Sequence, residues 1–198
     1  MKLFKAVGVG ITLFLITLGY ARADDYWLMI DTRAQSLMVM KGERVQLSFD
    51  NIAIGRNGPA PLRTRGDNTT PLGTFHIAWV NPRSKFKTFF GFDYPSRPLA
   101  EAALRQGLID IFTYEDIVSA IDAGRVPPQN TPLGGFLGIH GLGNADPGIH
   151  EKLNWTQGCV ALTNEQIEEL AKWVDIGTRV VISEGHMAAV DKHDRQIH

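Results

Sequence analysis

Cys159 is the only cysteine in this chain of 198 residues. No disulfide can form within the chain, so the fold has to be held together by its own hydrophobic core. Hydrophobic residues make up 44% of the sequence and charged residues 21%, which is typical of globular proteins. Because domains usually contain ~100–200 residues, the length predicts one domain rather than two.

The N-terminus has the pattern of a secretory signal peptide. Lys2 and Lys5 precede an apolar run over residues 6–20, and Ala21-Arg22-Ala23 has the small residues of a cleavage site. The alternative is a membrane anchor, but the run of 15 residues is short of the ~20 that span a bilayer. We therefore predict a signal peptide over residues 1–23, export to the periplasm or cell envelope, and no stable membrane anchor.

The charge balance argues against a nucleic-acid partner. Lysine and arginine total 20 against 21 for aspartate and glutamate, and removing residues 1–23 takes away three basic residues and no acidic one. The net charge thus falls from -1 to -4, whereas a phosphate backbone requires clustered cations. Residues 24–198 contain no HExxH motif, paired-cysteine spacing, phosphate loop or dinucleotide fingerprint, so we expect neither a metal nor a cofactor.

The first half of the mature chain is rich in short β-prone runs. Three of them predict a β-meander with a hairpin turn at Lys41-Gly42-Glu43: residues 27–30, 36–40 and 44–49. Residues 55–71 are rich in glycine, proline, asparagine and threonine and predict a long surface loop. A strand over residues 74–80 follows, and Asn81-Pro82 is expected to end it.

The second half mixes helical and strand patterns. Apolar spacing predicts two helices over residues 99–106 and 113–123, followed by a short strand over residues 136–139 that ends at His140. Thr163 and Gln166 form a capping-box pattern ahead of an amphipathic helix that extends to Val174, and residues 178–182 predict a final strand. These patterns predict a mainly β fold with flanking helices (α+β), with one domain over residues 24–184 and a polar tail over residues 185–198.

The chemistry is concentrated between His140 and Cys159. Cys159 follows Gly158 at the point where a loop enters an apolar segment, and His140 ends an apolar strand. A thiol needs a base within hydrogen-bonding reach to become a thiolate near neutral pH, and histidine supplies one. The alternative is an inert, buried cysteine, but an exported protein with an unpaired thiol favours a functional role. The other histidines are expected to be structural or to lie in the tail: His76, His150, His186, His193 and His198.

Cys159 and His140 also lie in two motifs with a fixed spacing. Gly138-Ile139-His140-Gly141 precedes Thr156-Gln157-Gly158-Cys159-Val160-Ala161-Leu162, and the cysteine follows the histidine by 19 positions. This arrangement resembles the signature of the L,D-transpeptidase catalytic domain, also called the YkuD domain. Residues 65–75 resemble the glycine-aspartate and threonine-proline-glycine segment that precedes a central strand in that family. The likeness continues in residues 31–45, an opening hairpin, and residues 177–182, a last strand.

The resemblance implies a β-sandwich with a helical insert before the active-site strand. It also implies action on bacterial peptidoglycan stem peptides through a thioester on Cys159, with His140 as base and later acid. The carbonyl of Gly141 would orient His140, and the amides of Gln157, Gly158 and Cys159 would form the oxyanion hole. No cofactor is implied, and the acceptor is an amine of another stem peptide or of a protein.

Two positions depart from the family pattern. Gln157 stands where many members have histidine, and Ala161 stands where many have arginine or asparagine. Neither change removes the nucleophile or the base, but Ala161 cannot bind a carboxylate as arginine does.

The sequence is compatible with three interpretations. The first is an exported transpeptidase that forms cross-links or attaches a protein to the wall, and the second is a cysteine carboxypeptidase or endopeptidase that uses water as acceptor. The third is a wall-binding domain without catalytic activity, which the presence of both His140 and Cys159 disfavours.

The insert over residues 99–132 leads into the strand that ends at His140, and we expect it to cover the active-site groove as a lid or wall.

Overall fold

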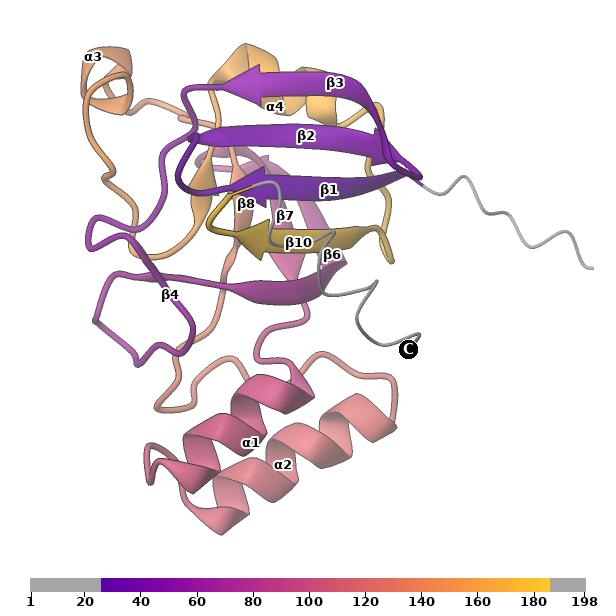
Figure 1. Ribbon diagram of the computed structural model, residues 1–198, viewed down its shortest axis with the longest axis vertical. Coiled ribbons are helices and arrows are strands. Elements are labelled where there is room, and N and C mark those ends of the chain that lie inside the picture. The colour runs from indigo at the N-terminus through magenta and orange to yellow at the C-terminus, as the bar shows by residue number, and fades with distance from the viewer. Residues whose placement is uncertain (1–25, 186–198) are drawn as a thin grey trace, which may run out of the picture.

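A computed structural model describes residues 26–185 of the chain (Figure 1). Eight strands form one mixed sheet in the order β3-β2-β1-β10-β6-β7-β8-β9, and β4 pairs separately with β5. The strands are β1 Tyr26–Asp31, β2 Ser36–Lys41, β3 Arg44–Asp50, β4 Pro59–Ala60, β5 Thr70–Pro71, β6 Gly73–Ser84, β7 Lys87–Phe92, β8 Gly138–His140, β9 Val160–Ala161 and β10 Arg179–Ser183. The helices are α1 Arg97–Arg105, α2 Ile111–Asp122, α3 Pro147–His150 and α4 Asn164–Leu170.

The predicted meander is confirmed in β1, β2 and β3, which pair antiparallel in chain order. Gly42 has φ +57° in the turn between β2 and β3, a conformation that glycine adopts without steric cost. The predicted last strand is also present as β10, which pairs parallel with β1. The two ends of the described chain therefore lie side by side within the sheet.

β6 is longer than its sequence predicted. The expected stop at Asn81-Pro82 is wrong, because β6 continues to Ser84 and pairs with β7. The register shifts between Asn81 and Ser84, so Pro82 lies in an irregularity where its missing N–H group removes no ladder hydrogen bond. β7 itself was not among the predicted strands. It brings Phe90 and Phe92 into the core.

The sheet curls until its two ends meet. β6 is shared by the half that contains β1, β2, β3 and β10 and by the half that contains β7, β8 and β9. Beyond β3, Ala53 exchanges two backbone hydrogen bonds with Ala161 in β9, at 3.0 and 2.7 Å. Buried side chains from both halves join in one hydrophobic core, so a single curled sheet supplies both layers of the expected sandwich.

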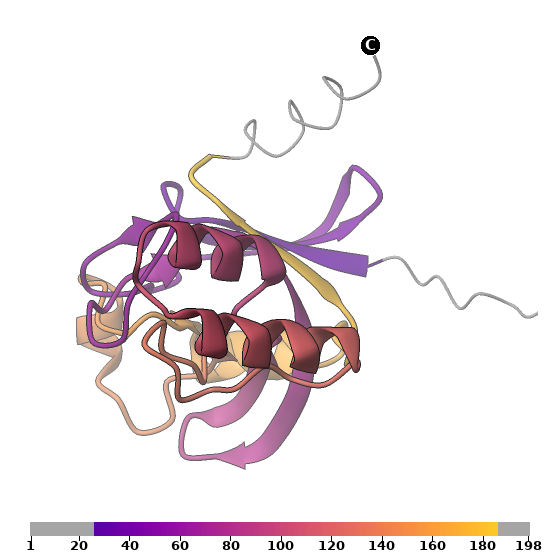
Figure 2. The same ribbon diagram turned by 90° about the horizontal axis from the view of Figure 1, so that it is seen from below.

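The helical insert is confirmed as two helices, α1 and α2, which lie side by side below the sheet (Figures 1 and 2). The side chain of Asp110 caps α2 by accepting a hydrogen bond from the amide of Thr113, so this helix begins two residues earlier than predicted. Arg97 forms an ion pair with Asp122 across the two helices. Leu99 and Ile117 turn inward and extend the main core.

The capping box that begins α4 is confirmed. Thr163 accepts a hydrogen bond from the amide of Gln166, and the side chain of Gln166 accepts one from the amide of Thr163, at 3.1 and 3.0 Å. α4 ends at Leu170, earlier than the predicted Val174, although Val174 is still buried in the core. α3 is a single short turn that was not predicted.

The expected loop over residues 55–71 has more pairing than its composition predicted. β4 and β5 lie within it, and the amide of Thr70 donates to the carbonyl of Gly58 at 2.9 Å. Thr70 is fully buried, so this backbone needs internal hydrogen-bond partners.

The predicted signal peptide over residues 1–23 lies outside the described residues, and so does nearly all of the predicted tail over residues 185–198. Within residues 26–185, no helix has the length and apolar character needed to cross a membrane.

Candidate active site

Cys159 lies in a tight loop immediately before β9. Thr156 organises this loop, because its hydroxyl accepts a hydrogen bond from the amide of Gly158 at 3.1 Å and donates one to the carbonyl of Cys159 at 2.6 Å. Gly158 has φ +125°, and its carbonyl accepts a hydrogen bond from the hydroxyl of Thr70 at 3.0 Å. The loop is therefore fixed from both sides, while Cys159 remains partly exposed.

His140 ends β8 and is held in one ring orientation. Its Nδ1 lies 2.7 Å from the carbonyl oxygen of Gly141, so Nδ1 carries the proton and Nε2 is left with a free lone pair when the ring is neutral. The ring stacks on Phe86 with 4.4 Å between centroids and meets the ring of Trp155 edge-on at 5.9 Å. The residue is only 3% exposed. Packing and one hydrogen bond thus fix both tautomer and orientation.

The pairing of β8 with β9 relates the position of His140 to that of Cys159. β8 and β9 are parallel neighbours, with Ile139 opposite Val160 and His140 opposite Ala161. Extending this register by one residue sets Gly138 opposite Cys159, and side chains alternate along a strand. By this extended register, His140 and Cys159 would project from the same face of the sheet. Gly138 has no side chain to stand between them.

The surroundings keep both groups neutral at rest. Burial lowers the pKa of His140 below its usual 6.5, against the opposing effect of the Gly141 carbonyl. Burial raises the pKa of the Cys159 thiol to about 11, although the Gly138 amide and the charge of Arg63 act in the opposite direction. A pKa of about 11 keeps the thiol protonated near neutral pH, and the lowered pKa of His140 favours the neutral imidazole.

The predicted oxyanion-hole residues differ in what their amides already do. The amide of Gly158 donates to the hydroxyl of Thr156. For the amides of Gln157 and Cys159, no acceptor is found within the described part of the chain. These two N–H groups are free to bind a developing negative charge.

The two departures from the family pattern lie in different environments. Gln157 is exposed beside the nucleophile. Ala161 is fully buried opposite His140, and both of its backbone groups are bonded to Ala53. Alanine carries no charge, so position 161 offers no cation to a carboxylate.

Sequence reasoning missed Arg63. Its guanidinium lies under the Cys159 loop and is 5% exposed, and its Nη1 donates to the carbonyl of Gln157 at 3.3 Å. The arginine comes from the loop predicted over residues 55–71, where glycine and proline indicated only turns. No pattern in that loop marks Arg63 as buried.

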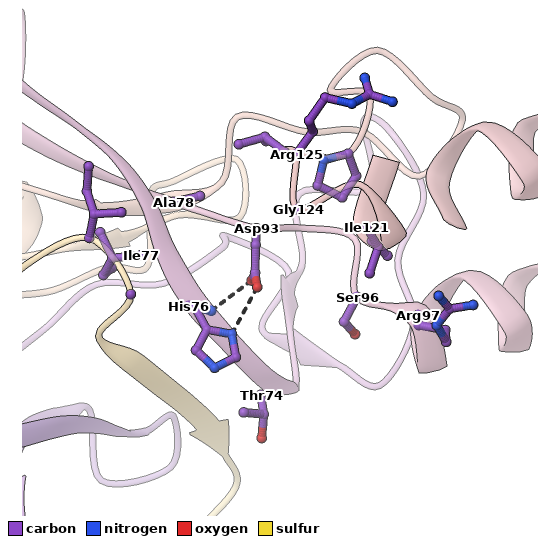
Figure 3. A pocket seen from close by; sticks show the side chains of 14 residues that line it. Thr74, His76, Ile77, Ala78, Asp93, Ser96, Arg97, Ile121, Gly124 and Arg125 are labelled. Carbon is purple, nitrogen blue, oxygen red and sulfur yellow. Dashed lines mark hydrogen bonds and ion pairs between the residues drawn. The ribbon is translucent and has the colours of Figure 1, made fainter. Parts of the chain in front are cut away.

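A cavity of about 410 Å³ lies between the first half of β6 and the α1–α2 pair (Figure 3). His76 and Asp93 form a hydrogen-bonded pair within it, at 3.0 Å between Nδ1 and the carboxylate. Neither His140 nor Cys159 lines this cavity. Over residues 26–185, no cluster of three histidine, cysteine or acidic side chains is arranged to hold a metal ion.

The helices of the insert and the segment after them have different relations to the site. α1 and α2 line the cavity of Figure 3. The segment that follows them reaches the nucleophile, since the carbonyl oxygen of Phe136 lies 3.6 Å from the sulfur of Cys159. The expectation that residues 99–132 form a lid remains a prediction.

The model of the YkuD family, the L,D-transpeptidase catalytic domain, matches residues 25–182, and the chain belongs to this family. The family membership predicted from the two motifs is therefore confirmed. The predicted mainly β fold with flanking helices is confirmed as well. A search of curated proteins finds no significant match.

Solved structures support the fold. The crystal structure of the helical cell shape determining protein Pgp2 from Campylobacter jejuni has 22% identity and a TM-score of 0.54, covering 81% of this chain and 48% of that chain. A single-residue variant of Pgp2 gives 20% identity and a TM-score of 0.51, with coverages of 82% and 49%. The present chain spans about half the length of these proteins.

Proposed function

We propose that this chain is an exported cysteine L,D-transpeptidase that acts on peptidoglycan stem peptides. The observation that carries the proposal is the parallel pairing of β8 with β9, a register that supports an approach of the oriented imidazole of His140 to the thiol of Cys159. Membership of the L,D-transpeptidase catalytic domain family supports the substrate class. The signal-peptide pattern of residues 1–23 supports export to the periplasm or cell envelope.

Acylation begins with proton transfer from the thiol of Cys159 to Nε2 of His140. The sulfur attacks the carbonyl carbon between the third residue of the stem peptide and D-alanine, and the carbonyl oxygen becomes an oxyanion. The protonated His140 then gives its proton to the amine of D-alanine as the C–N bond breaks. D-alanine leaves, and the peptide remains on Cys159 as a thioester.

Transfer reverses these roles. An acceptor amine attacks the thioester carbonyl, His140 takes a proton from the amine, and the protonated imidazole returns it to the sulfur as the C–S bond breaks. The acceptor is an amine of a second stem peptide, which gives a cross-link, or of a protein, which attaches that protein to the wall. Gly141 keeps Nδ1 protonated throughout, so Nε2 is the atom that exchanges the proton.

The oxyanion formed in each step needs donors near Cys159. The free amides of Gln157 and Cys159 supply two, and Gly158 adds a third when its amide leaves the hydroxyl of Thr156. Loss of one such donor costs ~10²–10³ in rate in other acyl-transfer enzymes. Arg63 fixes the carbonyl of Gln157 on the inner side of the loop.

Product analysis tests the proposal. The mature protein is incubated with disaccharide tetrapeptide monomers, and the products are separated and weighed by mass spectrometry. A new dimer with loss of D-alanine supports transfer, whereas a shortened monomer alone indicates a hydrolase. Cys159→Ser is expected to abolish both products while leaving the fold intact. Wild-type turnover by a folded Cys159→Ser protein, or no turnover by the wild type, contradicts the proposal, and the second result favours a wall-binding domain.

A further inference from the structure

Phe136 combines two features that are rarely found together. Its side chain is 67% exposed, although phenylalanine is one of the most hydrophobic residues. Its carbonyl oxygen lies 3.6 Å from the sulfur of Cys159, so its Cα is within about 6 Å of the nucleophile by standard backbone dimensions. The backbone that carries this apolar ring is therefore close to the thiol.

The backbone of Phe136 is in an unfavourable conformation. Its φ is +54°, in the left-handed region that bulky residues rarely adopt. Such conformations persist when the surrounding structure imposes them, and they occur most often at functional sites. Gly134 also has a positive φ, of +83°, but at Phe136, whose carbonyl lies beside the thiol, this conformation is adopted by an aromatic residue.

The surrounding loop holds Phe136 in this conformation. The side chain of Gln129 accepts a hydrogen bond from the Phe136 amide at 2.7 Å and donates to the carbonyls of Tyr94 and Pro127 at 2.7 and 2.8 Å. A Cβ at Gly135 would lie 2.2 Å from the carbonyl oxygen of Gln129, so the two backbones are in close contact. These bonds fix the backbone at position 136 and leave its ring in solvent.

We propose that the ring of Phe136 is a substrate-contact surface that packs against the hydrocarbon part of the stem peptide beside the scissile carbonyl. The inference rests on the proposed function, since it concerns the donor that Cys159 attacks. A single exposed phenylalanine on a helix, such as Phe112 at 73% exposed, needs no special explanation. Phe136 differs because the nucleophile, the left-handed backbone and the Gln129 brace coincide there.

The part of the stem peptide that Phe136 would contact is apolar rather than charged. The wall next to His140 is also aromatic, with Phe86 and Phe89 stacked on the imidazole at 4.4 and 6.1 Å. The exposed ring of Phe136 would add a further aromatic surface near Cys159. Contact with the aliphatic side chain of the third residue or the methyl group of D-alanine excludes water from the sulfur as the peptide binds.

Three variants test this role. Phe136→Asn removes the ring with a residue that tolerates the left-handed conformation, Phe136→Trp keeps an aromatic face, and Phe112→Ala removes an exposed phenylalanine of α2. With the disaccharide tetrapeptide as donor, we expect Phe136→Asn to lower kcat/KM by about fivefold to tenfold, mainly through KM. Phe136→Trp should restore most of this loss, and Phe112→Ala should match the wild type.

Two further measurements separate substrate contact from damage to the loop. Alkylation of Cys159 by iodoacetamide, which is too small to use the ring, should proceed at the same rate in Phe136→Asn and wild type. In the Cys159→Ser background, Phe136→Asn should weaken binding of the same tetrapeptide measured by calorimetry, whether or not the wild type turns it over. An unchanged kcat/KM and affinity, or an equal fall in alkylation and turnover, overturns the inference. If the wild type shows no turnover but Phe136→Asn still weakens binding in the Cys159→Ser background, the result contradicts the proposed function. It does not contradict contact between Phe136 and the stem peptide.

Discussion

The guanidinium of Arg63 and the carbonyl of Gln157 are joined by a 3.3 Å hydrogen bond directly beneath the nucleophile loop. Gly158 lies against the same group, because a Cβ there would be 2.2 Å from Nη1 of Arg63. The ion pair with Asp67 is long, at 3.6 Å, and Nε donates to no acceptor within residues 26–185. A buried cation with so few partners is costly, which favours a role in the site over a role in stability.

We expect Arg63→Met to lower kcat for stem-peptide turnover by about tenfold or more, because the 157–158 peptide loses its anchor. The same change should move the pH midpoint of iodoacetamide alkylation upward, since the charge of Arg63 lowers the pKa of the Cys159 thiol. Arg63→Lys keeps the charge and should recover part of both effects. A folded Arg63→Met protein with unchanged kcat and alkylation profile would show that Arg63 is only structural.

Gly158→Ala should remove activity and destabilise the fold. The position has φ +125°, and an added Cβ would meet the Arg63 guanidinium and the carbonyl oxygen of Thr69 at 2.2 and 2.6 Å. Gly42→Ala is the matched control, because Gly42 also has a positive φ but no atom within 4 Å of an added Cβ. Thermal unfolding should show that Gly42→Ala lowers the free energy of unfolding by about 1 kcal/mol and that Gly158→Ala lowers it by more. Equal losses of stability in the two variants, with activity retained in Gly158→Ala, would contradict close packing of Gly158 against Arg63 and Thr69.

The thiol and imidazole give a characteristic pH dependence of reactivity. Because the pKa of Cys159 is raised to about 11, the rate of alkylation by iodoacetamide should rise continuously from pH 7 to pH 10 without a plateau near neutrality. Turnover requires neutral His140, whose pKa is lowered from 6.5, so kcat/KM should remain high at pH 6.5 and fall only at lower pH. A stopped-flow alkylation profile with a plateau at pH 6–7 would indicate a resting ion pair instead.

Stability should depend on pH through the same histidine. The folded pKa of His140 is lower than 6.5, so below about pH 6.5 the unfolded chain binds a proton that the folded chain does not. The stabilisation is present above that pH and is lost as pH falls through the folded pKa. Denaturant unfolding at pH 7 and pH 5 should therefore give a lower free energy of unfolding at pH 5. In His140→Gln, the difference in the free energy of unfolding between pH 7 and pH 5 should be smaller. An unchanged difference would mean that other groups cause the pH dependence.

Local patterns in the sequence were sufficient for several elements of this fold. The capping box of Thr163 and Gln166 predicts the start of α4 because both of its hydrogen bonds form within one turn. The hairpin at Gly42 is equally local. The end of β6 was mispredicted because Pro82 is tolerated in a register shift with β7, and that partner strand could not be inferred from residues near Pro82.

The candidate site was only partly predictable for the same reason. The motif spacing identifies His140 and Cys159, but their relation depends on the parallel pairing of β8 with β9. Arg63 reaches Gln157 across 94 positions of sequence, and no periodicity encodes that contact. The left-handed backbone of Phe136 likewise follows from the bonds of Gln129, not from the preference of phenylalanine.

Asn164 links the start of α4 to the loop after His140. Its side chain accepts a hydrogen bond from the Gly143 amide and donates one to the Gly143 carbonyl, both at 2.9 Å. Its Oδ1 would also lie 2.9 Å from a Cβ at Gly141, so it packs against the residue whose carbonyl orients the imidazole. The side chain thus positions His140 through the 141–143 loop.

We expect Asn164→Ala to lower kcat by about tenfold with little change in KM, because a loosened Gly141 carbonyl no longer fixes the tautomer of His140. Thr163→Ala is the matched control, since it removes the cap of the same helix at a cost of about 1 kcal/mol without touching the loop. Kinetics with the disaccharide tetrapeptide and thermal unfolding of both variants check this prediction. If kcat falls equally in the two variants at equal loss of stability, Asn164 acts through the helix and not through His140.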